Sequence, residues 1–469
     1  MNLPRSTPEA QGIPSGAVSA FVRAAEAAGL ELHSFMLLRR GRVVAEAWWH
    51  PYAPQHPHVL YSLSKSFAAT AVGLAVAEGR LGLEDRVVSF FPDELPEAVS
   101  DNLEAMTVRH LLTMASGHAK DPFEAMNWGE QNWPQHILAQ PVEHAPGSRF
   151  VYNSAATYLL STILRRATGQ GLLDFLGPRL FEPLGIARPT WEACPQGTEI
   201  GGWGLSLPTE AIATFGQLYL QGGVWEGQRL LPEGWVEEAT ARQVDNASPE
   251  GKNPDWQQGY GYQFWRCQHG AYRGDGAFGQ YCVVMPDQEA VLAITSYVDD
   301  MQAVLNLAWE HLLSAMGGEA LPEGADSSLP ALLSSRAIAL PAGSHPGQVF
   351  RQTYRLEHNP LGLSELALET TPTGGVLEVK GADPPHRIVW SHGDWALGET
   401  GFLRSGPSKI AASGVWQNEA ELTLKVCYYE TPFCPVFTLA LGPQQLTVRA
   451  KGRMGFWEMP DPLLEGRPQ

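Results

Sequence analysis

The spacing of apolar residues divides the 469-residue chain into regions of different texture. In residues 1–316, apolar side chains recur every three or four positions in several windows, which predicts helices, and short apolar runs between them predict strands. Residues 317–346 are rich in Gly, Pro, Ser and Ala and predict a linker. In residues 347–469, short alternating runs separated by turn residues predict an all-β domain, a small barrel or sandwich.

The first region should contain both helices and strands. The predicted helices cover residues 15–28, 63–78, 108–114, 155–166, 209–221, 232–240 and 303–316. The predicted strands form a hairpin within 34–49, a single run over 259–265, and a pair over 281–285 and 290–297.

The helix predicted over 63–78 begins next to a Ser-x-x-Lys pair, Ser62 and Lys65. This spacing places both side chains on one helix face, one turn apart. A serine hydroxyl is a poor nucleophile until a base takes its proton, and a lysine can be that base if burial lowers its pKa. The alternative is an N-cap serine beside a solvated lysine. The Ala-rich helix has no other charged residue through Ala77, which indicates a buried lysine and favours catalysis.

Tyr152 and Ser154 precede a second long helix, predicted over 155–166. Tyr152 is a candidate proton-relay partner of Ser62 and Lys65, because a phenol near an ammonium group can have a lowered pKa. The alternative is a core tyrosine followed by an N-cap serine. The Ser62 and Lys65 pair favours the relay.

Two stretches carry further candidate chemistry. Residues 121–135 are interpreted as a loop that contains the aromatic residues Phe123, Trp128 and Trp133. These side chains either pack in the core or line a substrate cleft. Residues 274–279 match the bare dinucleotide pattern Gly-x-Gly-x-x-Gly. That pattern requires a helix after the glycines, whereas an apolar, strand-like run follows here, so a hairpin is predicted instead.

Composition and charge argue against several classes of partner. The chain has 32 Lys and Arg against 50 Asp and Glu, a net charge of −18, and no basic cluster, which argues against nucleic acid and membrane surfaces. Neither a signal peptide nor a long apolar span is recognised, so a cytoplasmic location is expected. The five scattered cysteines lack a Cys-x-x-Cys pair and predict reduced, mostly buried thiols. We expect no metal and no cofactor.

Three motifs occur together in chain order, namely Ser62-Leu63-Ser64-Lys65, Tyr152-Asn153-Ser154 and the Gly-rich hairpin. With them, the chain resembles the serine beta-lactamase/penicillin-binding superfamily, most of all its class C-like branch of esterases, peptidases and amide hydrolases. The segments 107–117 and 201–221 are also similar to that family. The resemblance covers roughly residues 1–316, and residues 347–469 resemble lipocalin-like barrels appended to some relatives.

The resemblance implies an α/β (α+β) fold, a mostly antiparallel sheet flanked by helices, with a helical region that holds Tyr152. It also implies that Ser62 is the acylated nucleophile, that Lys65 is its base partner and that Tyr152 is the proton shuttle. Ser154 stands at the third position of the family's Tyr-x-Asn/Ser motif and is expected to bind substrate.

The third motif departs from the family's Lys-Thr-Gly or His-x-Gly. Arg273 and the pair Asp275-Gly276 stand at that place. We therefore expect at most weak beta-lactamase activity and a preference for neutral substrates or substrates with a cationic group. The hairpin is expected to supply a strand N–H near Phe278 or Gly279 as the second oxyanion donor. The residues predicted to bind substrate on this hairpin are Arg273, Asp275, Gly276, Phe278 and Gly279.

The expected function is a serine hydrolase that forms an acyl-enzyme and cleaves small esters or amides, of the carboxylesterase, amidase or D-aminopeptidase type. The expected partner is a small-molecule ester, amide or peptide substrate. The alternative is a catalytically weak ligand-binding or penicillin-recognising sensor on the same fold.

Overall fold

The computed structural model describes residues 3–129, 131–322, 326–343, 349–381, 384–404 and 406–469. The chain folds into two compact units. The first comprises Met1–Ala47 and Pro57–Ser335, and the second comprises Trp48–His56 and Arg336–Gln469. The short segment that precedes the Ser62 region therefore belongs to the second unit.

The first unit is built on an antiparallel sheet with strand order β2-β1-β11-β10-β9-β8. The strands are β1 Glu31–Arg39, β2 Arg42–Trp48, β8 Trp265–Arg266, β9 Tyr272–Gly276, β10 Gln280–Met285 and β11 Ala290–Tyr297. β1, β9, β10 and β11 are buried almost throughout, because helices cover the sheet on both faces. This arrangement confirms the predicted fold class.

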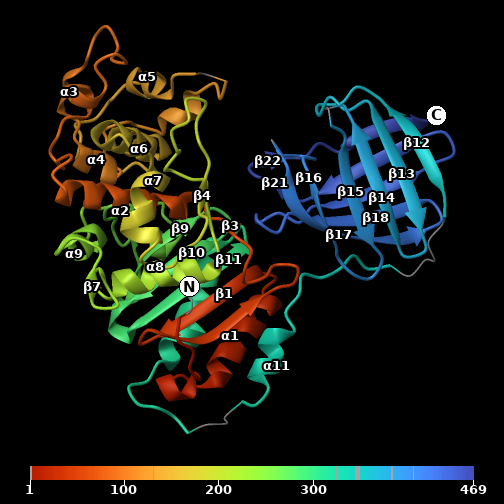
Figure 1. The fold of residues 1–469 in the computed structure, drawn as a ribbon, viewed down its shortest axis with the longest axis horizontal. Helices are drawn as coiled ribbons and strands as arrows, with labels where there is room; N and C mark the ends of the chain where they lie inside the picture. Colours follow the sequence, from red (N-terminus) through yellow and green to blue (C-terminus); the bar gives the residue numbers. More distant parts are fainter. Residues whose placement is uncertain (1–2, 130, 323–325, 344–348, 382–383, 405) are drawn as a thin grey trace. The chain divides into compact units, whose positions relative to one another are not determined.

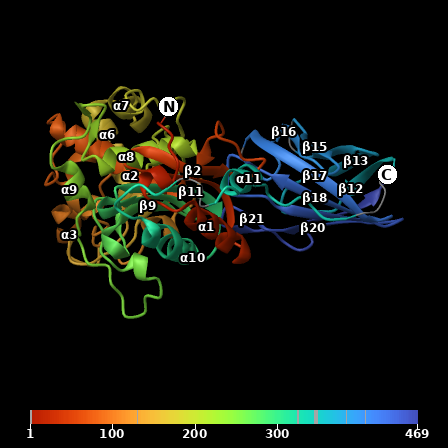
Figure 2. The same ribbon diagram turned by 90° about the horizontal axis from the view of Figure 1, so that it is seen from below.

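Helices flank this sheet on both sides. α8 (Thr209–Leu220) and α2 (Ser64–Ala77) lie on one side, while α1 (Ser15–Ala27) and α10 (Met301–Leu307) lie on the other (Figure 1, Figure 2). The rings of Phe67 on α2 and Phe215 on α8 stack with centroids 3.9 Å apart. The predicted helix 303–316 is interrupted, because α10 passes into the π-helical turn Ala308–Leu312.

A helical region packs on the far side of α2. Its helices are α3 Asp101–Ala105, α4 Val108–Leu112, α5 Trp133–Leu138, α6 Ser154–Thr168 and α7 Leu172–Leu176. α2 is buried along most of its length, which explains why apolar and small residues occupy nearly every position, rather than one face. The region also holds Tyr152, as expected.

The strand predicted over 259–265 is wrong. Gly259 and Gln263 have φ of 101° and 61°, and the Gly261 N–H donates to Phe264 O, so the chain turns here. A side chain at Gly261 would lie 2.1 Å from Ala239 O. The aromatic residues of this run gave a strand-like pattern, but they serve packing around a turn, and regular pairing is limited to β8.

The remaining small elements of the first unit connect these layers. They are β3 His58–Val59, β4 Thr190–Trp191, β5 Leu205–Leu207, β6 Val224–Trp225, β7 Gln228–Arg229, α9 Trp235–Thr240 and α11 Leu329–Ser334. α11 lies within the stretch predicted as a linker, and residues 323–325 and 344–346 of that stretch lie outside the described residues. In the part of the chain that the structure describes, none of the helices combines the length and apolar character needed to span a bilayer.

The second unit is a closed β-barrel, which confirms the predicted all-β region. Its strands are β12 Arg351–Leu356, β13 Glu365–Thr371, β14 Gly374–Lys380, β15 His386–Ser391, β16 Ala396–Thr400, β17 Ser408–Asn418, β18 Glu421–Cys427, β19 Val436–Leu441, β20 Leu446–Lys451 and β23 Leu464–Pro468, beside the small hairpin β21 Arg453–Met454 and β22 Trp457–Glu458. A parallel pairing of Ser391 with Ser413 closes the barrel between β15 and β17. Alternate residues point inward and fill it, among them Trp390, Trp416 and Phe437.

Candidate active site

Ser62 lies in a single 3₁₀ turn, Tyr61–Leu63, that runs directly into α2. The Leu60 N–H donates to Leu205 O, which fixes the entry to the turn, and Tyr61 has a positive φ of 48°. A positive φ is uncommon for a non-glycine residue and is typical of functional turns. Ser62 therefore stands at the N-terminal end of the helix, as the sequence predicts, and is partly exposed.

Lys65 is buried, with 1% of its surface exposed, and its ammonium nitrogen is fully engaged. Nζ donates to Ser62 Oγ at 3.0 Å, to Ser154 Oγ at 3.1 Å and to Gly202 O at 2.7 Å. Burial lowers the pKa of Lys65 to about 7, although the nearby carboxylates of Asp121 and Asp275 raise it. The amine can therefore lose its proton near neutral pH, which a solvated lysine cannot do.

Tyr152 lies beside this pair. Its ring centroid is 4.9 Å from Lys65 Nζ, its hydroxyl hydrogen-bonds with the side chain of Ser62, and its ring stacks on Trp265 at 5.4 Å. Burial raises the pKa of the Tyr152 phenol, and the charge of Asp275 raises it further. The expectation of a lowered pKa is therefore wrong, because removal of the phenol from water outweighs the Ser62 hydrogen bond and the charge of Arg273, which lower the pKa. Tyr152 stays a neutral phenol at physiological pH.

Ser154 is the first residue of α6 and is not its cap. The side chain of Asn153 caps the helix by accepting from the Ala156 N–H at 3.0 Å. The Ser154 hydroxyl is thus available to accept from Lys65. Asp121 holds the same helix end, since its carboxylate accepts from the Ser154 N–H at 2.6 Å and from the Ala155 N–H at 3.3 Å.

Asp121 and Gly202 are parts of the site that sequence reasoning missed. Asp121 comes from the stretch interpreted as a loop, Gly202 comes from a segment noted only for its similarity to the family, and neither residue was given a role at the site. Asp121 lies on the loop before α5, and Gly202 lies on the Gly-rich loop before β5. Only the folded chain brings them to Lys65.

The glycines of β9 allow this strand to lie directly on the start of α2. A Cβ atom at Gly276 would be 2.0 Å from Leu60 O and 3.1 Å from the backbone nitrogen of Ser62. A Cβ atom at Gly274 would be 2.5 Å from Ser66 Oγ. Strand β10 follows the glycines, which confirms the predicted hairpin.

Arg273 and Asp275 form a buried ion pair, with Arg273 Nε 2.8 Å from Asp275 Oδ2. The Arg273 guanidinium is not exposed at all, donates to Asp255 O and stacks over Trp256 at 4.1 Å. Burial raises the pKa of Asp275, although Arg273 opposes that shift. Arg273 is therefore placed to orient Asp275 and to hold the strand, and the predicted direct contact with substrate does not fit its burial.

Phe278 and Gly279 form the turn after β9. The Gly279 N–H donates to Gly276 O at 3.2 Å, so this donor is used within the turn and does not fit the predicted role at an oxyanion. Phe278 has a φ of 66°, and its ring meets the ring of Tyr61 at 5.3 Å, edge to face. The turn thereby packs against the residue before Ser62.

Aromatic side chains from separate loops gather next to the Lys65 network. Phe123, Trp128 and Trp203 have mutual centroid distances of 5.4 to 5.9 Å. Phe123 follows Asp121 closely, and Trp203 follows Gly202, the acceptor of Lys65. Trp128 is 56% exposed, so this aromatic cluster presents a ring to solvent.

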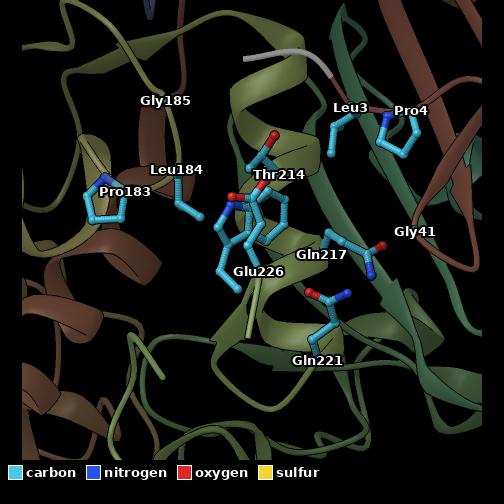
Figure 3. A pocket seen from close by; sticks show the side chains of 11 residues that line it. Leu3, Pro4, Gly41, Pro183, Leu184, Gly185, Thr214, Gln217, Gln221 and Glu226 are labelled. Carbon is cyan, nitrogen blue, oxygen red and sulfur yellow. The ribbon is translucent and has the colours of Figure 1, made fainter. Parts of the chain in front are cut away.

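The first unit also has a cavity of about 430 Å³ against α8. Figure 3 shows Thr214 and Gln217 of α8 between Leu184 on one side and Leu3 and Pro4 on the other. None of the residues predicted to be catalytic lines this cavity, so it is separate from the chemistry described above.

Comparison with known proteins identifies the family. Residues 15–315 match the family described as Beta-lactamase. The chain belongs to the beta-lactamase family. Within that family, the chain is 27% identical to the 6-aminohexanoate-dimer hydrolase of Paenarthrobacter ureafaciens, over 57% of this chain and 73% of that protein.

Two further matches extend the comparison. The chain is 27% identical to Esterase EstB of Burkholderia gladioli over 33% of its own length and 43% of the esterase. The solved structure of a putative 6-aminohexanoate-dimer hydrolase from Bacillus anthracis superposes with a TM-score of 0.53 at 20% identity, covering 68% of this chain and 89% of that one. The structural match shows the fold alone. Family and relatives together support a serine hydrolase in general.

Proposed function

We propose that this member of the beta-lactamase family hydrolyses small esters or amides through an acyl-enzyme on Ser62. The observation that carries the proposal is the buried amine of Lys65, 3.0 Å from Ser62 Oγ and with a pKa of about 7. A lysine with that pKa is partly unprotonated at neutral pH and can accept the serine proton. Burying an amine in this way would otherwise only destabilise the fold.

The chemical steps follow from the contacts. Lys65 Nζ takes the proton from Ser62 Oγ, and Oγ attacks the carbonyl carbon of the substrate to give a tetrahedral intermediate. Tyr152, a neutral phenol in contact with Ser62, donates its proton to the leaving alcohol or amine and regains one from Lys65. Collapse of the intermediate leaves the acyl group on Ser62. Water, activated by the same pair, then releases the acid.

The developing oxyanion needs two N–H donors. One is the N–H of Ser62, among the unpaired donors at the start of the helix. Gly276 lies against the Ser62 backbone, and we assign the second donor to the next N–H along the chain, that of Ala277. This assignment moves the donor one or two residues back from the positions predicted from sequence.

Replacement of Tyr152 by Phe tests its role as the relay. The ring and its stacking on Trp265 remain, but the proton between Lys65 and the leaving group is lost. We expect kcat for an amide substrate to fall roughly 10²–10³-fold, the usual size of general acid catalysis. We expect a smaller loss for an ester with a good leaving group, such as a p-nitrophenyl ester. Equal losses for both substrates would contradict a role at the leaving group.

The substrate is proposed to carry an apolar or aromatic group and no anionic group beside the scissile bond. The negative charges of Asp121 and Asp275 act on Lys65, and the cationic residue that would hold a substrate carboxylate is replaced by a buried, paired Arg273. The exposed Trp128 and its neighbour Trp203 offer an aromatic surface next to Gly202. These features also favour substrates with an ammonium group.

Replacement of Trp128 by Ala tests the aromatic surface. We expect KM for a phenylacetyl or benzoyl ester to rise up to about tenfold, because one aromatic contact contributes roughly 0.5–1.5 kcal/mol beyond its buried area. The KM for an acetyl ester should change little. Trp225→Ala removes a partly exposed tryptophan near the separate α8 cavity and is the matched control. The assignment would be refuted if Trp225→Ala also lost the preference for the aromatic ester over the acetyl ester, or if Trp128→Ala kept that preference.

The test of the function itself is mass spectrometry of the intact protein. Wild-type protein and Ser62→Ala are exposed in parallel to short-chain esters, D-amino-acid peptides and a penicillin. We expect a transient mass increase equal to the acyl group on wild type with the esters, and none on the variant. Melting shifts without any adduct or turnover across the panel would instead support a ligand-binding sensor.

A further inference from the structure

We propose that Cys427 and Cys434 form a disulfide at the loop end of the β18–β19 hairpin in the barrel unit. The two Sγ atoms lie 2.7 Å apart. Unbonded heavy atoms of this size rest at about 3.5 Å or more, so the two sulfurs already lie inside their contact distance. Small movements of the two side chains would bring them to bonding distance.

The strand register explains why the two cysteines meet. Lys425 pairs with Val436, and the same register continues past the end of β18 as the Val426 N–H donates to Pro435 O and the Tyr428 N–H donates to Phe433 O. Cys427 and Cys434 are therefore directly opposite each other, between two hydrogen-bonded pairs.

A position of that kind is a non-hydrogen-bonded pair of an antiparallel ladder. The two Cα atoms of such a pair are about 4.5 Å apart, within the range that a disulfide spans. The backbone thus presents both thiols to each other without any rearrangement. Cys427 and Cys434 are seven residues apart, so they do not form a Cys-x-x-Cys motif and the sequence pattern alone does not mark them as a pair.

The other cysteines have different surroundings. All three are buried in the first unit, where Cys194 accepts from Tyr158, Cys267 accepts from Arg273 and Cys282 donates to Ile212 O. Cys427 is also buried, but Cys434 is only partly so. Cys434 is therefore the thiol that a small oxidant reaches first.

The reaction with oxidised glutathione balances as a thiol–disulfide exchange. The Cys434 thiolate attacks one sulfur of oxidised glutathione, the glutathione disulfide breaks, and one reduced glutathione leaves. The Cys427 thiolate then attacks Cys434 Sγ in the mixed disulfide and releases the second glutathione. The two protons lost by the protein thiols end on the two glutathione thiols.

The cross-link would stiffen a loop that holds the segment leading to the nucleophile. Tyr52 donates to Thr431 O at 2.9 Å, Tyr52 Oη lies 3.6 Å from Cys434 Sγ, and His56 stacks on Tyr429 at 4.4 Å. Tyr52 and His56 belong to the segment Trp48–His56 of the barrel unit. A disulfide at the base of this loop would therefore restrain the chain shortly before Ser62.

The 469-residue protein is incubated in glutathione buffers of increasing oxidised fraction, then alkylated with N-ethylmaleimide in denaturant, so that the buried thiols also react, and analysed by mass spectrometry before and after non-reducing proteolysis. We expect the number of alkylated thiols to fall from five to three, with no bound glutathione and a single cross-linked peptide pair that contains Cys427 and Cys434. Five alkylated thiols at every ratio, stable glutathione on Cys434 alone, or a cross-link to another cysteine would each overturn the proposal.

Variants provide an independent check. Cys194→Ser should keep the cross-link, whereas Cys434→Ser should lose it. Thermal unfolding of the oxidised wild type should occur at a higher temperature than that of the reduced protein, and Cys434→Ser should show no such difference. An equal shift in Cys434→Ser would also refute the assignment.

Discussion

Replacement of Ser62 by Ala should abolish ester hydrolysis, with a loss in kcat of about 10³-fold or more, as expected when a covalent nucleophile is removed. The variant keeps the helix and its buried lysine but has no oxygen to form the acyl bond. Residual turnover would come only from the oxyanion donors and substrate binding. The measurement is the steady-state rate with a p-nitrophenyl ester, together with labelling by a fluorophosphonate probe.

A neighbouring serine provides the matched control. Ser64 lies two residues further on, is fully buried, and its hydroxyl accepts from the Leu205 N–H at 3.1 Å. Ser64→Ala should be labelled by the probe like the wild type, although its stability will be lower. Labelling of Ser62→Ala to the wild-type extent would show that the nucleophile lies elsewhere.

Replacement of Lys65 by Met should lower kcat/KM by about 10²–10⁴-fold, because Met has a similar length but cannot accept a proton. In the wild type, the unprotonated amine is the active form. Activity should therefore be low in acid and should rise with pH through about 7, the pKa to which burial lowers Lys65. The pH dependence of kcat/KM, measured between pH 5 and 9, checks this expectation.

Asp121→Asn connects that pH profile to the structure. The Asp121 carboxylate raises the pKa of Lys65 against the effect of burial, so loss of its charge should shift the midpoint to lower pH. The amide oxygen can still accept from the Ser154 N–H, which limits damage to α6. An unchanged midpoint in Asp121→Asn, or a pH profile in Lys65→Met like that of the wild type, would show that Lys65 is not the titrating base.

Features formed by residues close together in the chain could be predicted from the sequence, whereas features formed by distant residues could not. The hairpin of β10 and β11 was predicted because its apolar runs and its turn at Pro286-Asp287 are contiguous in the chain. The strand predicted over 259–265 is wrong because the aromatic residues of this run are buried by packing around a turn. The turn shows in the positive φ of Gly259 and Gln263 and in the hydrogen bond from the Gly261 N–H to Phe264 O, and a glutamine gives no sequence signal for a positive φ.

The sequence by itself determined the place of Ser62 and Lys65, since a helix fixes the geometry of residues three apart, and it determined the change to a β domain in the second half of the chain. The tertiary structure decided everything that depends on distant segments meeting. It brought Asp121, Gly202 and Tyr152 to one amine, buried Arg273 on Asp275, and set the Cys427 and Cys434 sulfurs side by side. A pKa depends on burial and on neighbouring charges, and those exist only once the chain has folded.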